Sequence, residues 1–353
     1  MKKYLRKQFN VNGVAFNIFS DITDEISEYF KESVIDDHSL ITSEYNIYFY
    51  EDPALYLEKI RGFRKDKAVS YDTFNNQVHY KYGNTFMIDN EEYLCEVIDD
   101  NNFVVYSGNK EKSCKNLIRI MREILVRDME DKGYFFMHGN GIRIMDHGIL
   151  ILGGSGSGKT TFTSKINSEV LPQEFISNDR IFITEDEMRY FPLPIVYAMG
   201  TVKTNPNLDK FFRENNVLEL RRGGKYEEAS FGKKCDVPLS AIPKIFPWIK
   251  NRPTSQIDLV VFPRITDKKE QIRVLNLEEA SERLDLCNFT PNDIESNRKP
   301  WIKFRKITDK ALDENKKILN RSLSSRVMII DFPYQYETSG KEIVKSLKRF
   351  LWE

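Results

Sequence analysis

The segment from Gly153 to Thr160 constrains the fold more than any other part of this sequence, because it reads Gly-Gly-Ser-Gly-Ser-Gly-Lys-Thr. It fits the phosphate-binding-loop (P-loop) pattern Gly-x-x-x-x-Gly-Lys-Ser/Thr at every fixed position. The apolar run 148–152 before it predicts a buried strand, and residues 161–166 after it predict a helix. Glycines let the backbone wrap around a phosphate, and N–H groups at a helix N-terminus point toward negative charge. We therefore expect an α/β domain that holds a nucleoside triphosphate.

The pattern also assigns roles inside this segment. Lys159 is expected to reach the β- and γ-phosphates, and the hydroxyl of Thr160 is expected to ligate Mg²⁺. A nucleoside triphosphate and Mg²⁺ are therefore the expected ligands of this segment. The residues expected to bind the nucleotide are Gly153, Gly154, Ser155, Gly156, Ser157, Gly158, Lys159, Thr160 and Thr161.

The P-loop pattern occurs in several classes of protein, and an acidic residue near the loop would help to distinguish them. Two aspartates are candidates for this residue. Asp179 ends the run 175–179, and Asp331 ends the apolar run 327–331. An aspartate at a strand end beside such a loop can lie next to Mg²⁺ or take a proton from an attacking hydroxyl. For Asp331 a purely structural role is the commoner outcome. The base-reading pattern Asn-Lys-x-Asp of GTPases and the transporter signature Leu-Ser-Gly-Gly-Gln do not occur in the sequence.

The flanking residues resemble a known family over about residues 134–183. Phe136-Met137-His138-Gly139, the run 148–152 with the loop, and Ser177-Asn178-Asp179-Arg180-Ile181 are similar to the kinase domain of HPr kinase/phosphorylase. ATP-dependent phosphoenolpyruvate carboxykinase shares the same core more distantly. The resemblance implies an α/β P-loop domain with a mixed sheet and a serine-kinase-like activity.

The resemblance also implies site residues. His138 falls on the family's active-site histidine, Lys159 and Thr160 on its phosphate and Mg²⁺ residues, and Asp179 on the second of its paired aspartates. The implied catalytic residues are Asp179, His138 and Lys159, and the implied metal ligands are Thr160 and Asp179. Asn178 replaces the family's first aspartate, and an amide cannot act as a general base. Asp179 would therefore orient or deprotonate the acceptor.

The expected reaction is transfer of the γ-phosphate of ATP to a hydroxyl, with a serine of a protein or small peptide as the acceptor. Two alternatives remain open at this point. One is a P-loop ATPase whose hydrolysis drives a conformational switch. The other is a nucleotide-binding regulatory module without turnover, which the amide at Asn178 brings into consideration.

We expect two domains, with a β-rich module over residues 1–112 and the nucleotide-binding domain over 113–353. In the first, aromatic and β-branched runs separated by Asn, Asp and Gly clusters predict a small antiparallel sheet that serves as a scaffold or recognition module. The runs are 45–50, 77–82, 92–97 and 103–106. A helix that begins near Ser113 and ends near Gly133 is expected to open the second domain.

In the second domain, two or three strands are expected over 134–138, 142–145 and 149–152, with a turn at Asn140-Gly141 between the first two ranges. The charged stretch 267–325 contains expected helices near 277–286 and 306–320 and is left open as a lid, an oligomer arm or surface helices. A strand over 326–332 and a helix over 338–352 complete the expected elements. Arg264 and the run 221–225 are minor candidates for anion binding.

Charge and hydropathy exclude several classes of protein. Lys and Arg total 53 and Asp and Glu total 53, and this balance argues against a main role in binding nucleic acid or a membrane surface. The sequence contains no apolar run of the roughly 18 residues that a membrane-spanning helix needs. Its basic start leads into Asn10 and Asn12 without the apolar core of a secretory signal. We expect a cytoplasmic protein and leave a homo-oligomer open.

Overall fold

The computed structural model divides the chain into two compact units of mixed α/β structure. The first unit comprises Met1–Lys31, Asp36–Tyr134 and Phe289–Leu312, and the second comprises Glu32–Ile35, Phe135–Asn288 and Asp313–Glu353. The structure describes residues 5–21, 24, 26–28, 40–72, 78–88, 93–215, 230–266, 271–290, 307–333 and 340–352. Within these ranges, no helix has both the length and the apolar composition required to cross a membrane.

An eight-stranded sheet forms the core of the first unit, in the order β1-β2-β3-β8-β7-β6-β5-β4. Its strands are β1 (Leu5–Val11), β2 (Val14–Ser20), β3 (Ser43–Glu51), β4 (Val69–Asp72), β5 (Val78–Tyr82), β6 (Thr85–Ile88), β7 (Tyr93–Val97) and β8 (Asn102–Ser107). The expectation of an antiparallel sheet is wrong at two places, because β2–β3 and β3–β8 pair in parallel. The segments between these partners are long enough for the crossover that parallel pairing requires.

Helices α2 and α3 belong to the first unit. Helix α2 (Pro53–Gly62) is capped at its N-terminus by Asp52, whose carboxylate accepts from the N–H groups of Ala54 and Leu55. Helix α3 (Ser113–Asp131) contacts β2, β3 and β8, and the Tyr45 hydroxyl donates to Asp128 Oδ1 at 2.8 Å. The expected domain boundary at residue 113 lies at the start of α3, whereas the two units divide after Tyr134, beyond the end of α3. Helix α3 belongs to the first unit because it buries its apolar face there.

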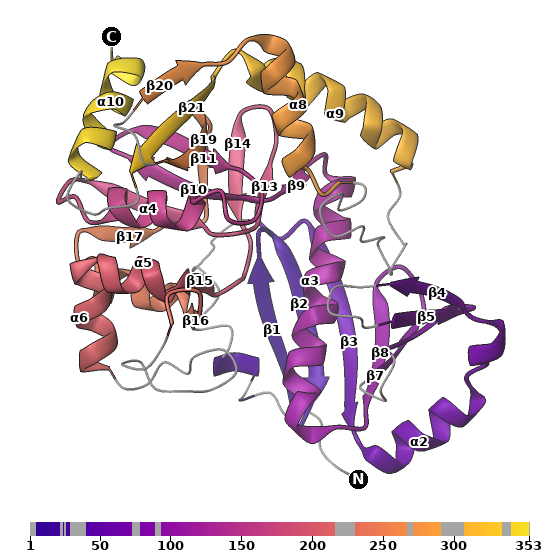
Figure 1. Cartoon of the computed structure of the whole chain (residues 1–353). Coiled ribbons are helices and arrows are strands. Elements are labelled where there is room, and N and C mark those ends of the chain that lie inside the picture. Colours follow the sequence, from indigo (N-terminus) through magenta and orange to yellow (C-terminus); the bar gives the residue numbers. More distant parts are fainter. Residues whose placement is uncertain are drawn as a thin grey trace. The chain divides into compact units, whose positions relative to one another are not determined.

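A seven-stranded mixed sheet forms the core of the second unit, in the order β17-β12-β10-β11-β19-β21-β20 (Figure 1). Its strands are β10 (Gly139–Ile144), β11 (His147–Leu152), β12 (Gln173–Ser177), β17 (Ile249–Asn251), β19 (Leu259–Thr266), β20 (Gln271–Val274) and β21 (Val327–Pro333). Only β10 and β20 run antiparallel to their neighbours in this sheet.

Two smaller sheets contain the other described strands of this unit. A four-stranded sheet has the order β18-β14-β13-β9, and β15 pairs with β16. The bounds are β9 (Phe135–Met137), β13 (Ile181–Ile183), β14 (Glu187–Tyr190), β15 (Ile195–Ala198), β16 (Lys234–Val237) and β18 (Thr254–Gln256). The pairing of β9 with β13 brings the segment before β10 next to the segment after β12.

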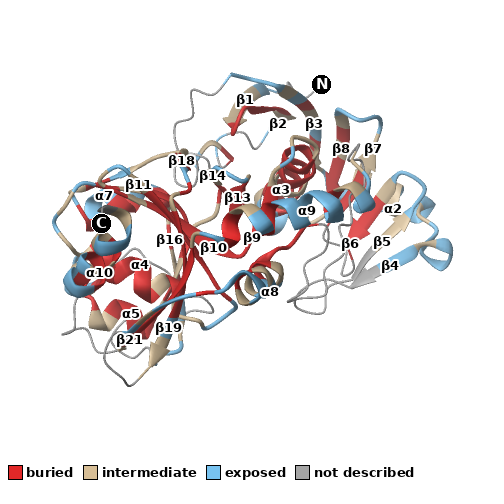
Figure 2. Cartoon of the chain, turned by 90° about the horizontal axis from the view of Figure 1, so that it is seen from above, coloured by how far each residue is buried: buried red, intermediate tan, exposed pale blue. Residues whose placement is uncertain are grey.

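The helices of the second unit are α4 (Lys159–Asn167), α5 (Met199–Thr204), α6 (Pro206–Glu214), α7 (Ile242–Ile245), α8 (Leu277–Cys287), α9 (Asp309–Ser324, whose first residues belong to the first unit) and α10 (Gly340–Trp352). Short 3-10 turns are η1 (Lys65–Lys67), η2 (Lys110–Lys112) and η3 (Leu239–Ala241). Helix α4 and the central strands are buried, whereas α9 exposes one side (Figure 2).

The stretch 267–325 forms more than surface helices. Helices α8 and α9 occur where helices were expected, but residues 271–274 form strand β20, which the sequence analysis missed. Strand β20 adds to the sheet at its edge and pairs antiparallel with β21. Residues 267–270, 291–306 and the run 221–225 lie outside the described residues.

Asn140 and Gly141 do not form the expected turn, because both lie inside β10. A Cβ atom on Gly141 would lie 2.6 Å from Ile181 Cδ1 and 3.0 Å from Met188 Sδ. The glycine is therefore required by close packing of the two sheets rather than by a change of chain direction.

Candidate functional site

The candidate residues meet at one edge of the seven-stranded sheet. Strands β11, β12, β19 and β21 run in the same direction, so their carboxyl ends lie at the same edge of the sheet. The antiparallel strand β10 begins at that edge, since Gly139 pairs with Leu152. The edge therefore carries the residue before β10, the loop after β11 and the residues after β12. Ligands of open α/β sheets bind at such edges.

The glycine-rich loop (residues 153–158) connects β11 to α4 and contains three glycines with positive φ. The values are 153° at Gly153, 80° at Gly156 and 96° at Gly158. Gly158 precedes α4, and a Cβ atom there would lie 2.7 Å from Ile265 Cγ1. The first bond inside α4 runs from the Phe162 N–H to the Gly158 carbonyl, so the N–H groups before Phe162 point out of the helix end.

Lys159, His138 and Asp179 lie in contact beside this loop. Lys159 Nζ donates to the carbonyls of Gly153 (2.6 Å) and Gly154 (3.0 Å). It also lies 3.0 Å from His138 Nε2, which is 3.2 Å from Asp179 Oδ1. The imidazole nitrogen can accept from the lysine or donate to the carboxylate, depending on its tautomer. The histidine therefore connects the loop lysine to the carboxylate.

The backbone at Asp179 has a positive φ of 66°, which aspartate tolerates better than most residues. Its N–H donates to Asn140 Oδ1 at 2.9 Å, and the Asn140 amide donates in turn to Thr163 Oγ1 of α4. Ser177 Oγ donates to the Arg180 carbonyl and accepts from the Phe191 N–H. These contacts hold the turn after β12 in one conformation, so the carboxylate has a defined position.

The carboxyl of Asp179 is ionised at neutral pH. Burial favours the neutral acid, but the hydrogen bond with His138 and the positive charge of Arg180 act in the opposite direction and are larger in sum. The charges of His138 and Lys159 add to the same effect, and the pKa of Asp179 lies well below its usual range. Its side chain is 38% exposed, so one side of the carboxylate remains accessible to a ligand.

Thr160 faces Asn178 rather than Asp179. The Thr160 hydroxyl donates to Asn178 Oδ1 at 3.5 Å, whereas the carboxylate oxygens of Asp179 contact His138 and Arg180. Among the described residues, no three His, Cys, Asp or Glu side chains are grouped to hold a metal ion. Mg²⁺ commonly binds through few protein oxygens together with substrate phosphates and water. The oxygens of Thr160 and Asn178 fit that pattern.

Two polar atoms near the loop have no partner in the described part of the chain. They are Ser157 Oγ and Asn178 Nδ2, and both are shielded from solvent. Buried polar groups normally have hydrogen-bond partners, and exceptions cluster where a ligand, ion or water completes the site. Both atoms are therefore candidates for contacts with a bound ligand.

Other residues from the sequence analysis have different surroundings. Thr161, expected to bind the nucleotide, shares a hydrogen bond with Thr201 at 2.8 Å and is buried under α5, so its side chain is turned away from the loop. Asp331 forms two hydrogen bonds of 2.7 Å with Arg264. The aspartate expected as the weaker metal candidate is thus neutralised by an arginine.

The sequence analysis missed Asn140 and Ser177 as supports of the site. The available signal for Asn140 was an amide between two glycines just before Ile142, where a buried polar side chain requires partners. Comparison with models of known protein families and with curated proteins finds no match to this chain.

Proposed function

We propose that this chain is an ATP-dependent phosphotransferase, similar to the kinase domain of HPr kinase/phosphorylase, that transfers the γ-phosphate to a hydroxyl group. The observation that carries the proposal is the continuous contact from the glycine-rich loop through Lys159 and His138 to the ionised carboxylate of Asp179. A phosphate-binding loop and a carboxylate with a fixed position are the parts that phosphoryl transfer to a hydroxyl requires.

Lys159 has the central role in phosphate binding in this proposal. Its ammonium group is already next to the loop, where it donates to two backbone carbonyls. A bound triphosphate replaces these weak acceptors with charged oxygens, which form stronger hydrogen bonds. The N–H groups at the start of α4 point to the same anion.

Asp179 orients the acceptor. Its ionised carboxylate accepts a hydrogen bond from the acceptor hydroxyl, whose oxygen attacks the γ-phosphorus as the bond to the β-phosphate oxygen breaks. The proton leaves toward the carboxylate or the transferred phosphate, and ADP is released. Because its pKa is low, Asp179 serves to position the hydroxyl more than to remove its proton early. Arg180, held next to Asp179, is placed to contact the transferred phosphate.

The metal in this proposal is Mg²⁺, held by Thr160 and, in place of the expected Asp179, by the amide oxygen of Asn178. When bound, Mg²⁺ neutralises charge on the phosphates. The acceptor is a serine of a protein or small peptide, by analogy with the resembling family. Use of ATP fits a cytoplasmic location, and the two-domain division into a β-rich module and a nucleotide-binding domain belongs to the same proposal.

The test is phosphoryl transfer from γ-labelled ATP, with a cell lysate or peptide library as acceptor and mass spectrometry to find new phosphoserines. Asp179→Asn should lower the rate at least about a hundredfold, which is the usual scale for a positioned acid or base. Lys159→Ala should abolish triphosphate turnover. The matched control is Asp146→Asn, because Asp146 lies in the turn between β10 and β11 at the opposite edge and is 89% exposed.

The outcomes separate the alternatives. Labelled acceptor in the wild type, lost in Asp179→Asn and kept in Asp146→Asn, supports the kinase. Release of free phosphate without a labelled acceptor would contradict the kinase proposal and favour an ATPase whose hydrolysis drives a conformational switch. Tight binding of ATP with neither product would favour a regulatory module, and unchanged turnover in a folded Lys159→Ala variant would contradict the role of the loop.

A further inference from the structure

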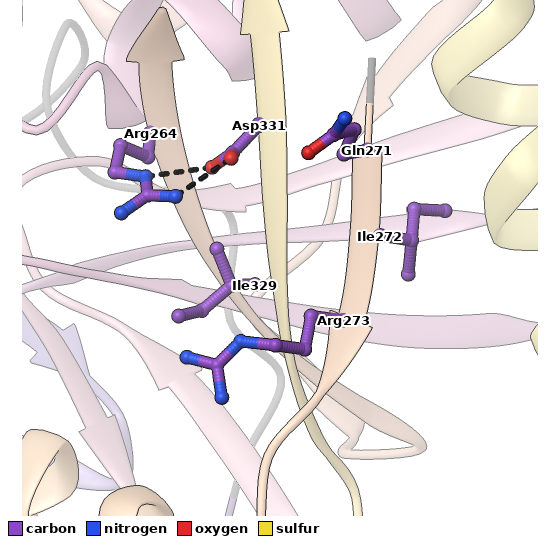
Figure 3. A pocket seen from close by; sticks show the side chains of 6 residues that line it. All are labelled: Arg264, Gln271, Ile272, Arg273, Ile329 and Asp331. Carbon is purple, nitrogen blue, oxygen red and sulfur yellow. Dashed lines mark hydrogen bonds and ion pairs between the residues drawn. The ribbon is translucent and has the colours of Figure 1, made fainter.

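Two adjoining pockets lie along the sheet beside the glycine-rich loop. The first has a volume of about 260 Å³ and is bordered by the loop and by strand β19 and helix α8; its residues include Gly156, Ser157 and Pro263. The second has a volume of about 410 Å³ and is lined by residues of β19, β20 and β21 (Figure 3). Arg264 and Ile329 line both pockets, so the two form one continuous surface.

The part of these pockets that Arg264 and Asp331 line lies across β11 from Asp179. In the sheet order, β11 lies between β10 and β19. His138 and Asp179 are attached to β10 and β12 on one side, whereas Arg264 and Asp331 are attached to β19 and β21 on the other. A triphosphate whose γ-phosphate faces Asp179 therefore directs its α-phosphate toward these pockets.

Arg264 offers a flat surface there. Its Nε and Nη2 atoms donate to the two carboxylate oxygens of Asp331, each at 2.7 Å. The Asp331 side chain is only 10% exposed, whereas that of Arg264 is 62% exposed. The carboxylate thus fixes the plane of the guanidinium while leaving its surface accessible. Guanidinium planes fixed in this way stack on planar rings, including nucleobases.

The other arginines of these pockets do not form a strong anion site. Arg273 extends from β20 across β21, and Ile329 lies between its guanidinium and that of Arg264 (Figure 3). Arg273 donates to Glu279 at 2.7 Å. Arg283 lies 5.9 Å from the ring of Phe262. Arg264 and Arg273 are each paired with a carboxylate, and apolar residues such as Ile329 and Ile265 fill the spaces between. This composition suits an uncharged planar group better than a phosphate.

We propose that these pockets bind the nucleoside of the triphosphate and that its base, a purine, stacks on the guanidinium of Arg264. Asp331 acts as a positioning residue that fixes the guanidinium plane. The inference rests on the proposed function, because it takes the triphosphate to occupy the glycine-rich loop. Purines are favoured because a larger ring system covers more of the guanidinium and of Ile329.

The test compares two ligands that share the phosphates and differ in the nucleoside. Binding of Mg-ATP and of magnesium with inorganic tripolyphosphate is measured by titration calorimetry on the full chain. The wild type should bind ATP roughly tenfold more tightly than tripolyphosphate, the scale of one stacked base. Arg264→Lys keeps the charge but loses the plane, so it should remove this difference and leave tripolyphosphate binding unchanged.

Further variants complete the design. Asp331→Asn should reduce the preference for ATP without changing tripolyphosphate binding, whereas Arg321→Lys, at an exposed position in α9, should change neither. Equal affinity for both ligands in the wild type, or an equal loss of both in Arg264→Lys, would overturn the nucleoside assignment and leave the loop assignment standing. If the wild type binds neither ligand, the proposed function fails and the nucleoside assignment fails with it.

Discussion

At the scale of single residues, Asp179 combines a rare backbone conformation with a strongly stabilised negative charge. Its pKa in the folded chain is depressed below the unfolded value of about 3.9 by the contacts with His138 and Arg180. Ionisation therefore favours the folded state above about pH 4, and this contribution is lost as the pH falls toward the depressed pKa.

Asp179→Asn should accordingly lose stability at neutral pH. Asparagine keeps the tolerance for positive φ, so the comparison isolates the charge. The difference in the free energy of unfolding between wild type and variant should be largest near pH 7 and should narrow below about pH 4. Urea unfolding at both pH values measures it. A difference that stays constant with pH would show that the carboxylate is not stabilised by its neighbours.

Substitution of Asn178 tests the proposed Mg²⁺ site. Asn178→Asp places a carboxylate opposite the Thr160 hydroxyl with almost the same volume. The variant should be less stable without metal, because a second buried carboxylate beside Asp179 adds like-charge repulsion. Mg²⁺ should then raise its melting temperature more than that of the wild type, since binding to the native state adds stability.

The matched variant for that experiment is Asn178→Ala, which removes the side-chain oxygen Oδ1. In this variant Mg²⁺ should not raise the melting temperature. Thermal scans with and without Mg²⁺, and without nucleotide, give the readout independently of activity. Equal responses of the aspartate and alanine variants would place the metal away from position 178.

At the scale of elements, the turn from the glycine-rich loop into α4 depends on Gly158 more than on Gly156. Gly158→Ala should destabilise the chain by more than the about 1–2 kcal/mol that a left-handed conformation costs alanine, because its Cβ also meets Ile265. Gly156→Ala is the matched control, since its φ is similarly positive but no atom lies within 4 Å of the added Cβ. Denaturant unfolding of both variants should rank them in that order, and equal losses would contradict the packing argument.

The elements also show what the sequence could predict. The strand, loop and helix from β11 to α4 follow from a local pattern, because glycines, lysine and apolar runs act within twenty residues. The expected turn at Asn140-Gly141 is wrong because an Asn-Gly pair can mark either a turn or a closely packed strand. The contacts of Gly141 with Ile181 and Met188 distinguish the two cases, and these residues are distant in the sequence. The pair of Arg264 with Asp331 could not be predicted, since it depends on which strands become neighbours.

At the scale of the whole molecule, the two units should respond separately to ligand and mutation. Mg-ATP should slow hydrogen exchange in the glycine-rich loop and at residues 177–180, because the proposed contacts lie in the second unit. Tyr45→Phe should instead speed exchange in β3 and α3 of the first unit, because Asp128 loses a buried donor worth about 1–3 kcal/mol. Exchange measured by mass spectrometry distinguishes the two patterns. Protection of β3 by Mg-ATP would show that the nucleotide is bound elsewhere or that the units are coupled.

The parallel pairing of β11 with β19, and of β19 with β21, has a consequence for how the chain is synthesised. The Gly148 N–H donates to the carboxylate of Asp258, which lies 110 residues later in the sequence. Arg264 donates to Asp331, which lies 67 residues after Arg264. A ribosome therefore releases the glycine-rich loop long before strands β19 and β21, and the edge of β11 that pairs with β19 stays unpaired during that interval. Pairing over such separations is slow, and exposed apolar edges of this kind favour aggregation or chaperone binding. A nascent chain that ends before β21 would contain the entire glycine-rich loop and still lack Ile329 and Asp331, which line the pocket next to β20.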